Sequence, residues 1–235
     1  MLSLERPTKC LNVSLGRKEC LEKFKKSIFD KSMKHKGITI PFVMLKKISS
    51  GKEINLFSTQ VKEFYHTYGS NVKAFGLSFY IWSKDILDSI EFIGKSLKRL
   101  DLERTSISPS VLSVIIQKTP HINDVDISRV YLSSLKEHQV KSWKLESLKR
   151  LDLERTSMTP SVLSVIIQKT PHINDVDISR VYLSSLKEDQ AKSWELESLK
   201  KSDLGYTRIT DSVLSLIKSS YPKASFSTLT RQNNY

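Results

Sequence analysis

The stretch SLKRLDLERTS runs from Ser96 to Ser106 and stands again, unchanged, from Ser147 to Ser157. The identity extends well beyond it, because Ser96–Glu146 aligns without a gap to Ser147–Glu197 over 51 residues and differs at only five positions. A third copy begins at Ser198 with SLKKSDLGYTRITDSVLSLI and then diverges. Such internal repetition is typical of architectures in which each copy packs against its neighbours.

The elementary repeat is about half of this unit. An apolar phrase of the form L-x-x-L-x-L returns at steps of 25 or 26 residues, and its six occurrences begin at Val72, Leu97, Ile122, Leu148, Ile173 and Leu199. Alternation of apolar and polar residues within the phrase predicts a short strand whose apolar side chains point into a core. Because one such strand cannot bury its own apolar face, the copies are expected to stack and to share one core.

A helix is predicted after every second strand, where Ser or Thr is followed by Pro or Asp. These pairs are Ser108-Pro109, Thr159-Pro160 and Thr210-Asp211, and each is typical of a helix N-terminus. The alternate repeats show weaker apolar periodicity, from which a helix over Ser134–Trp143 is predicted. The predicted fold is therefore an α/β solenoid, a curved arc with parallel strands inside and helices outside.

This pattern resembles the cysteine-containing subclass of the leucine-rich repeat family, which reads roughly LxxLDLxxCxxIT…L…I…P.L. The residues that follow it are Leu97, Leu100, Leu102, Thr105, Ile107, Leu112, Ile115 and Pro120. Thr105, Thr156 and Thr207 stand where the subclass has Cys, and Val130 and Val181 stand there in the alternate repeats. The resemblance covers residues 61–235 and implies a horseshoe of about six to seven repeats.

The concave surface is expected to carry positions three, five and seven of each phrase, counted from its first apolar residue. The charged residues there are Arg99, Asp101, Glu103, Asp124, Asp126, Arg150, Asp152, Glu154, Asp175, Asp177, Lys201 and Asp203. They comprise nine acids and three bases, within a chain of net charge +13. Two interpretations remain: an ordinary solvated surface, or a docking surface for a basic protein segment. Either surface would repel the phosphates of nucleic acid.

Residues 1–60 form a separate basic region in this interpretation. Its stretch Thr8–Phe24, TKCLNVSLGRKECLEKF, resembles the C-terminal half of an F-box, in truncated or degenerate form. F-box proteins with leucine-rich repeats recruit substrates to a Skp–cullin–F-box ubiquitin ligase, so the resemblance implies that Leu11, Val13 and Leu15 bind a Skp-type adaptor. The alternative is an amphipathic helix that caps the first exposed edge of the solenoid core.

Composition limits the remaining functions. Residues 1–71 carry 14 Lys/Arg against 6 Asp/Glu, whereas residues 72–235 carry 24 against 19, so the two regions are expected to meet different partners. Two cysteines near the N-terminus favour a reducing compartment, cytoplasmic or nuclear, and no apolar run reaches the roughly eighteen residues of a membrane span. No motif of catalytic residues, metal ligands or phosphate-binding glycines is apparent, so we expect neither an enzyme nor a cofactor or metal.

Three hypotheses for function follow. The first is substrate recognition for a ubiquitin ligase of the F-box type, by a monomer within a complex. The second is a stand-alone interaction scaffold with no link to ubiquitin. The third is a basic binder of nucleic acid or of a membrane surface, acting through residues 1–60.

Overall fold

The computed structural model describes residues 43–46, 74–78, 87, 90–91 and 93–228. Within this part of the chain, eight strands form one parallel sheet, and they lie side by side in the order of the sequence. The strands are β1 (Val43–Lys46), β2 (Ala74–Ser78), β3 (Arg99–Asp101), β4 (Asp124–Asp126), β5 (Arg150–Asp152), β6 (Asp175–Asp177), β7 (Lys201–Asp203) and β8 (Ser225–Ser227). The predicted parallel sheet is confirmed.

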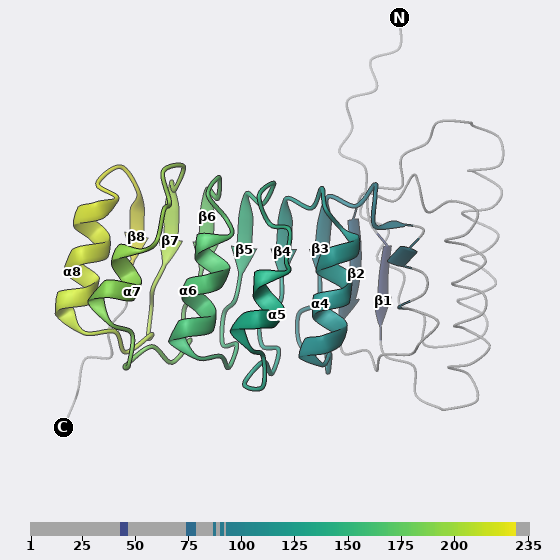
Figure 1. The fold of residues 1–235 in the computed structure, drawn as a ribbon, viewed down its shortest axis with the longest axis horizontal. Coiled ribbons are helices and arrows are strands. Elements are labelled where there is room, and N and C mark those ends of the chain that lie inside the picture. The colour runs from purple at the N-terminus through teal and green to yellow at the C-terminus, as the bar shows by residue number, and fades with distance from the viewer. Residues whose placement is uncertain (1–42, 47–73, 79–86, 88–89, 92, 229–235) are drawn as a thin grey trace, which may run out of the picture.

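Helices alternate with these strands along the chain. They are α4 (Pro109–Lys118), α5 (Glu137–Lys141), α6 (Pro160–Gln168), α7 (Glu188–Lys192) and α8 (Asp211–Ser220). All five lie in one layer on the same side of the sheet, and the stack of strand-and-helix pairs runs along the long axis of the molecule (Figure 1). This α/β arrangement is compatible with a solenoid-like arc.

The strand register reproduces the repeat period of the sequence. Leu100 of β3 is the register partner of Val125, which pairs in turn with Leu151, and Leu151 pairs with Val176. Each pairing therefore advances the chain by one repeat and brings equivalent positions side by side. A side chain that recurs along the sequence consequently forms a column across the sheet.

The expected helix N-termini are present at α4, α6 and α8. The side-chain oxygens of Ser108, Thr159 and Thr210 accept hydrogen bonds from the backbone N–H three residues later, at 3.4, 3.3 and 3.4 Å. Proline is the first residue of α4 and of α6, where its missing N–H breaks no hydrogen bond.

The helices of the alternate repeats are shorter than predicted. The expected helix Ser134–Trp143 is in fact α5, Glu137–Lys141. It begins only there because the backbone N–H of Lys136 donates to Oε1 of Gln139 at 2.9 Å, and because Leu135 is buried in the preceding turn. Long and short helices therefore alternate along the outer layer.

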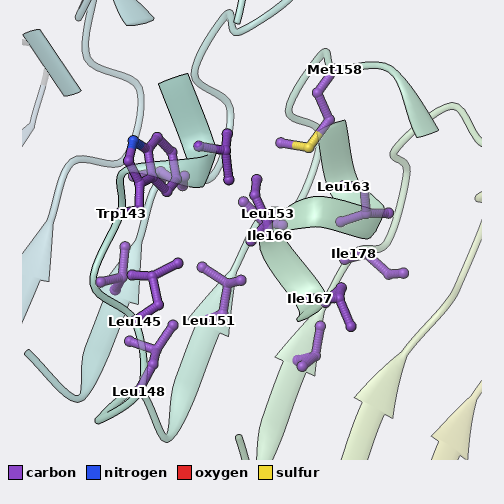
Figure 2. Packing of buried hydrophobic residues seen from close by; sticks show 14 of the residues in the cluster. Trp143, Leu145, Leu148, Leu151, Leu153, Met158, Leu163, Ile166, Ile167 and Ile178 are labelled. Atoms are coloured by element: carbon purple, nitrogen blue, oxygen red, sulfur yellow. The ribbon is translucent and has the colours of Figure 1, made fainter. Parts of the chain in front are cut away.

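One apolar core runs between the sheet and the helices. Leu97, Leu100 and Leu102 are fully buried, as the alternating phrase predicts. Trp143 is buried with them and packs near Leu145, as Figure 2 shows. Its indole Nε1 donates to Oγ of Ser113 in α4 at 3.0 Å, so this tryptophan joins one repeat to the preceding helix.

Thr105, Thr156 and Thr207, at equivalent positions of three repeats, are buried and hydrogen-bonded. The hydroxyls of Thr105, Thr156 and Thr207 donate to the carbonyls of Leu102, Leu153 and Leu204 at 2.8, 2.7 and 2.9 Å. Each threonine hydroxyl thus has a hydrogen-bond acceptor. Threonine at this buried position therefore avoids the free-energy cost of an unpaired buried donor.

The first strand lies ahead of the expected domain boundary. β1 pairs in parallel with β2, so the sheet already includes residues of the range 1–60. The edge of the sheet therefore does not coincide with the predicted boundary between residues 60 and 61. The predicted cap, the F-box-like stretch and its candidate adaptor-binding residues Leu11, Val13 and Leu15 lie outside the described residues.

Candidate protein-binding surface

A column of aspartates crosses the sheet at position five. The register places Asp101, Asp126, Asp152, Asp177 and Asp203 side by side in five successive strands. Their alternation with buried residues puts them on the face opposite the helices. They are not freely exposed, however, because Asp101 is only 9% exposed and the others are half-buried.

Each of these aspartates also has a structural role that the sequence analysis did not include. Its Oδ1 accepts the backbone N–H two residues later, and the donors are Glu103, Ser128, Glu154, Ser179 and Gly205, at 3.2, 3.0, 3.1, 2.9 and 2.8 Å. Aspartate commonly makes this bond at the start of a turn. The signal was present, since an Asp ends each strand phrase just before the chain turns.

A left-handed residue follows at position eight of every one of these repeats. The residues are Arg104, Arg129, Arg155, Arg180 and Tyr206, with φ between 55° and 60°. The backbone N–H of each of these arginines still donates to the carbonyl of position seven in the next repeat, so the left-handed turn begins while the chain is bonded to its neighbour. Asp at position five and the turn at position eight thus form one structural unit.

Burial, and after it the neighbouring carboxylates, raise the pKa of two aspartates in the column. Burial, followed by the charges of Asp126 and Asp177, raises the pKa of Asp152 to about 6, against the opposing hydrogen bond from the Glu154 backbone. The pKa of Asp101 is also raised, first by burial and then by the charge of Asp126. The column therefore holds negative charge at a cost, which a positively charged partner would relieve.

Position three carries the cross-strand ion pairs that its alternating charges predict. Asp124 lies 3.5 Å from Nε of Arg99 and 3.4 Å from Nη1 of Arg150. Asp175 lies 3.8 Å from Nε of Arg150. No ion pair joins Asp175 to Lys201, although both residues are described and are register partners.

Glu103 and Glu154 differ from the other predicted acids in this set. Both form ion pairs with arginines of position eight. Arg129 joins them, with Nη1 at 3.2 Å from Glu103 and Nη2 at 3.1 Å from Glu154. Arg155 and Arg180 approach Glu154 as well, at 3.5 and 3.4 Å.

These arginines were missed in the sequence analysis, although Arg recurs at position eight of four successive repeats. Without Glu103 and Glu154, the acidic face consists of positions three and five, with seven acids and three bases. Its residues are Arg99, Asp101, Asp124, Asp126, Arg150, Asp152, Asp175, Asp177, Lys201 and Asp203. We call this set the acidic face; it is the candidate binding surface.

Neither protein-family models nor curated proteins match this chain. In the part that the structure describes, no helix is long and apolar enough to cross a membrane. The described residues also include no group of three or more His, Cys, Asp or Glu side chains arranged to hold a metal ion.

Proposed function

We propose that this chain is a protein–protein interaction module of the leucine-rich repeat type, whose acidic face binds a basic segment of another protein. The observation that carries the proposal is the aspartate column, in which unlike charges are too few to neutralise the carboxylates. A lysine or arginine segment laid across the strands would meet one aspartate per strand, about 4.8 Å apart. Such a segment would offset the charges of Asp126 and Asp177, which after burial are the causes that raise the pKa of Asp152.

The proposal is tested with a fluorescent peptide that repeats Lys-Lys-Leu, titrated with the full chain. The double variant Asp126→Asn, Asp177→Asn removes two charges from the acidic face but keeps the Oδ1 acceptors for Ser128 and Ser179. We expect it to weaken binding by about tenfold, because long-range attraction and direct ion pairs are both lost.

The matched control is Glu137→Gln with Glu188→Gln, which removes two charges from equivalent positions of α5 and α7 on the helical side. It should leave the affinity for the peptide nearly unchanged. Equal losses in both double variants would mean that the peptide responds only to net charge, and the acidic face would lose its assigned role.

The ubiquitin-ligase part of the proposal rests on the F-box resemblance of Thr8–Phe24 and on its common association with this repeat class. We infer that this segment binds a Skp-type adaptor through Leu11, Val13 and Leu15. The test is capture of a purified Skp-type adaptor by the full chain, compared with the triple variant in which these three residues are Ala. Capture that depends on them supports the ligase role; absence of capture favours a stand-alone scaffold.

A further inference from the structure

A second surface of opposite charge borders the acidic face. It lies where the strands end and is formed by positions eight and ten of successive repeats. Its members are Tyr131, Arg155, Arg180, Tyr182, Tyr206 and Arg208, which we call the Arg/Tyr ridge. The strand register spaces its rows about 4.8 Å apart.

The ridge contains the exposed large aromatic side chains of the described residues. Tyr131 is 74% exposed, Tyr182 61% and Tyr206 42%. Two of these rings have an arginine over one face. The guanidinium of Arg208 lies 5.5 Å from the ring centroid of Tyr182, and the guanidinium of Arg180 lies 5.4 Å from the ring centroid of Tyr206. Tyrosine and arginine are the residue types that most often dominate binding energy at protein interfaces.

The backbone beneath the ridge is strained in a way that glycine would avoid. Arg155, Arg180, Tyr206 and Arg208 have φ of 56°, 60°, 59° and 57°. A residue with a Cβ in this region costs about 1 kcal/mol relative to its relaxed state. The same conformation at Arg104 and Arg129 shows that the turn recurs from repeat to repeat and sets the position-eight side chains in a row.

Guanidinium groups outnumber carboxylates along the ridge. Glu154 is shared by Arg129, Arg155 and Arg180. Arg155 is half exposed and approaches Glu154 through Nε at 3.5 Å. A planar guanidinium fork binds a second carboxylate through two parallel hydrogen bonds.

We propose that the Arg/Tyr ridge is a second docking surface, which binds an acidic segment of a partner protein. Carboxylates of the segment bind Arg155, Arg180 and Arg208. Tyr131 and Tyr182, two strands apart and therefore roughly 10 Å from each other, flank an apolar side chain of the same segment. An extended peptide covers that distance in about three residues. One apolar residue and two acidic residues therefore span the distance between the two tyrosines.

A peptide fits this surface better than nucleic acid does. Asp152 precedes Arg155 by three residues, so the acidic face begins directly beside the ridge. A nucleic-acid strand carries a phosphate on every nucleotide and would be repelled there. A peptide can direct its carboxylates to one side only. Binding at the Arg/Tyr ridge is independent of binding at the acidic face, because the two surfaces are different and their partners carry opposite charge.

The experiment measures binding of the full chain to a fluorescent peptide that repeats Glu-Glu-Leu. We expect Arg155→Ala with Arg180→Ala to weaken binding by about tenfold. Arg155→Lys with Arg180→Lys keeps both charges but removes the fork, so its loss should be smaller but measurable. Lys141→Ala with Lys192→Ala, at the ends of α5 and α7, is the matched control and should bind as the unchanged chain does.

A second pair of variants tests the tyrosines. Tyr131→Ser with Tyr182→Ser should weaken binding of the Glu-Glu-Leu peptide but not of a peptide of glutamate alone. Far-ultraviolet circular dichroism and the melting temperature confirm that each variant is folded before its affinity is compared.

Three results would overturn the proposal. Unchanged affinity in the arginine variants would show that acidic peptides bind elsewhere, and equal loss in the lysine control would show a response to net charge alone. Tighter binding of an oligothymidylate strand, abolished by the same arginine substitutions, would make the ridge a nucleic-acid surface. Binding of Glu-Glu-Leu should also survive Asp126→Asn with Asp177→Asn, so the ridge and the acidic face succeed or fail separately.

Discussion

Asp152 has two roles that oppose each other energetically. Its Oδ1 accepts the backbone N–H of Glu154 at 3.1 Å and so helps to end β5, while its charge lies between those of Asp126 and Asp177. The hydrogen bond needs only an oxygen acceptor, whereas the repulsion needs the ionised carboxylate. An asparagine at this position keeps the acceptor and removes the charge, together with the ion pair between Oδ2 of Asp152 and Nη2 of Arg150 at 3.1 Å.

We predict that Asp152→Asn stabilises the protein at neutral pH. The pKa of Asp152 is about 6 in the folded chain and 3.8 when unperturbed, so the folded state binds the proton more tightly than the unfolded state does. Wild-type stability should therefore fall as pH rises from about 4 to about 7. The gain from Asn should be near zero at about pH 4 and about 1 kcal/mol at about pH 7, after allowance for solvent screening.

Urea unfolding of both chains across this pH range measures the difference. Asp203→Asn is the control, because Asp203 accepts the same backbone bond from Gly205 but has Ser227 rather than an aspartate beside it on β8. It should stabilise the protein less than Asp152→Asn does at neutral pH. An Asp152→Asn effect that does not change with pH would contradict the electrostatic explanation.

Gly94 is a second position where a single added atom should change the stability of the fold. A Cβ at this buried residue would meet the carbonyl oxygens of Lys118 and Ile90. Both are backbone atoms that cannot rotate away, so Gly94→Ala should destabilise the fold by about 1–3 kcal/mol. Thermal unfolding measures the loss, and the exposed neighbour substitution Lys95→Ala should leave the melting temperature nearly unchanged.

At the scale of elements, a buried hydrogen bond joins each short repeat to the long helix before it. Nε1 of Trp143 donates to Oγ of Ser113 in α4, and Nε1 of Trp194 donates to Oγ of Ser164 in α6 at 3.2 Å. The two copies form the same contact, although the helices that follow each strand alternate in length. Each of these bonds joins side chains that are 30 residues apart in the sequence.

We predict that Ser113→Ala costs about 1–3 kcal/mol, because it leaves the indole N–H of Trp143 buried without an acceptor. In a chain that also carries Trp143→Phe, the same substitution should cost much less, since no donor remains to be satisfied. A double-mutant cycle of urea unfolding free energies measures this coupling. Equal costs of Ser113→Ala in both backgrounds would show that the bond contributes nothing.

The sequence predicts the strands and the long helices because these depend on local pattern. The alternating phrase locates β3 to β7, and Ser or Thr before Pro or Asp locates the first residue of α4, α6 and α8. The helix expected over Ser134–Trp143 is longer than α5, since a weak period does not reveal a turn whose residues are also apolar.

The candidate site is predictable only in part, for a related reason. Positions three and five follow the strand alternation and lie on the predicted face. The ion pairs of Glu103 and Glu154 do not follow from this alternation, because they depend on Arg129, a left-handed residue of the turn whose guanidinium lies between the two glutamates. Alternation says nothing about side chains beyond the last strand residue, so the ridge required the structure.

At the scale of the whole molecule, charge is divided between two parallel bands. The acidic face runs across the strands, and the Arg/Tyr ridge follows their ends. Both bands continue from strand to strand because the register places equivalent positions of successive repeats side by side. A partner with basic and acidic segments side by side could therefore contact both bands at once, with an affinity greater than either band provides alone.

The near-identity of the two 51-residue units leads to the last prediction, which concerns the modularity of the stack. Deletion of residues 147–197 joins Glu146 to Ser198, the same residue types that meet at Glu197 and Ser198. In the shorter chain, β4 would take the place of β6 as the neighbour of β7. β4 and β6 have the same sequence, Asp-Val-Asp, so β7 would meet an identical strand. Because each repeat packs against its neighbours only, we expect this shorter chain to fold cooperatively, with a lower melting temperature.

The control is a deletion of one repeat instead of two. It also joins equivalent positions of two repeats, but it breaks the alternation of long and short helices. Removal of residues 122–147 would pair β3 with β5, placing Arg99 opposite Arg150, and would also remove Trp143 from beside α4. Circular dichroism during heating should show a cooperative transition for the whole-unit deletion and a broad or absent one for the half-unit deletion. Equal behaviour of the two chains would mean that the pair of repeats is not the structural unit. In that case, one strand with one helix of either length would suffice to continue the stack.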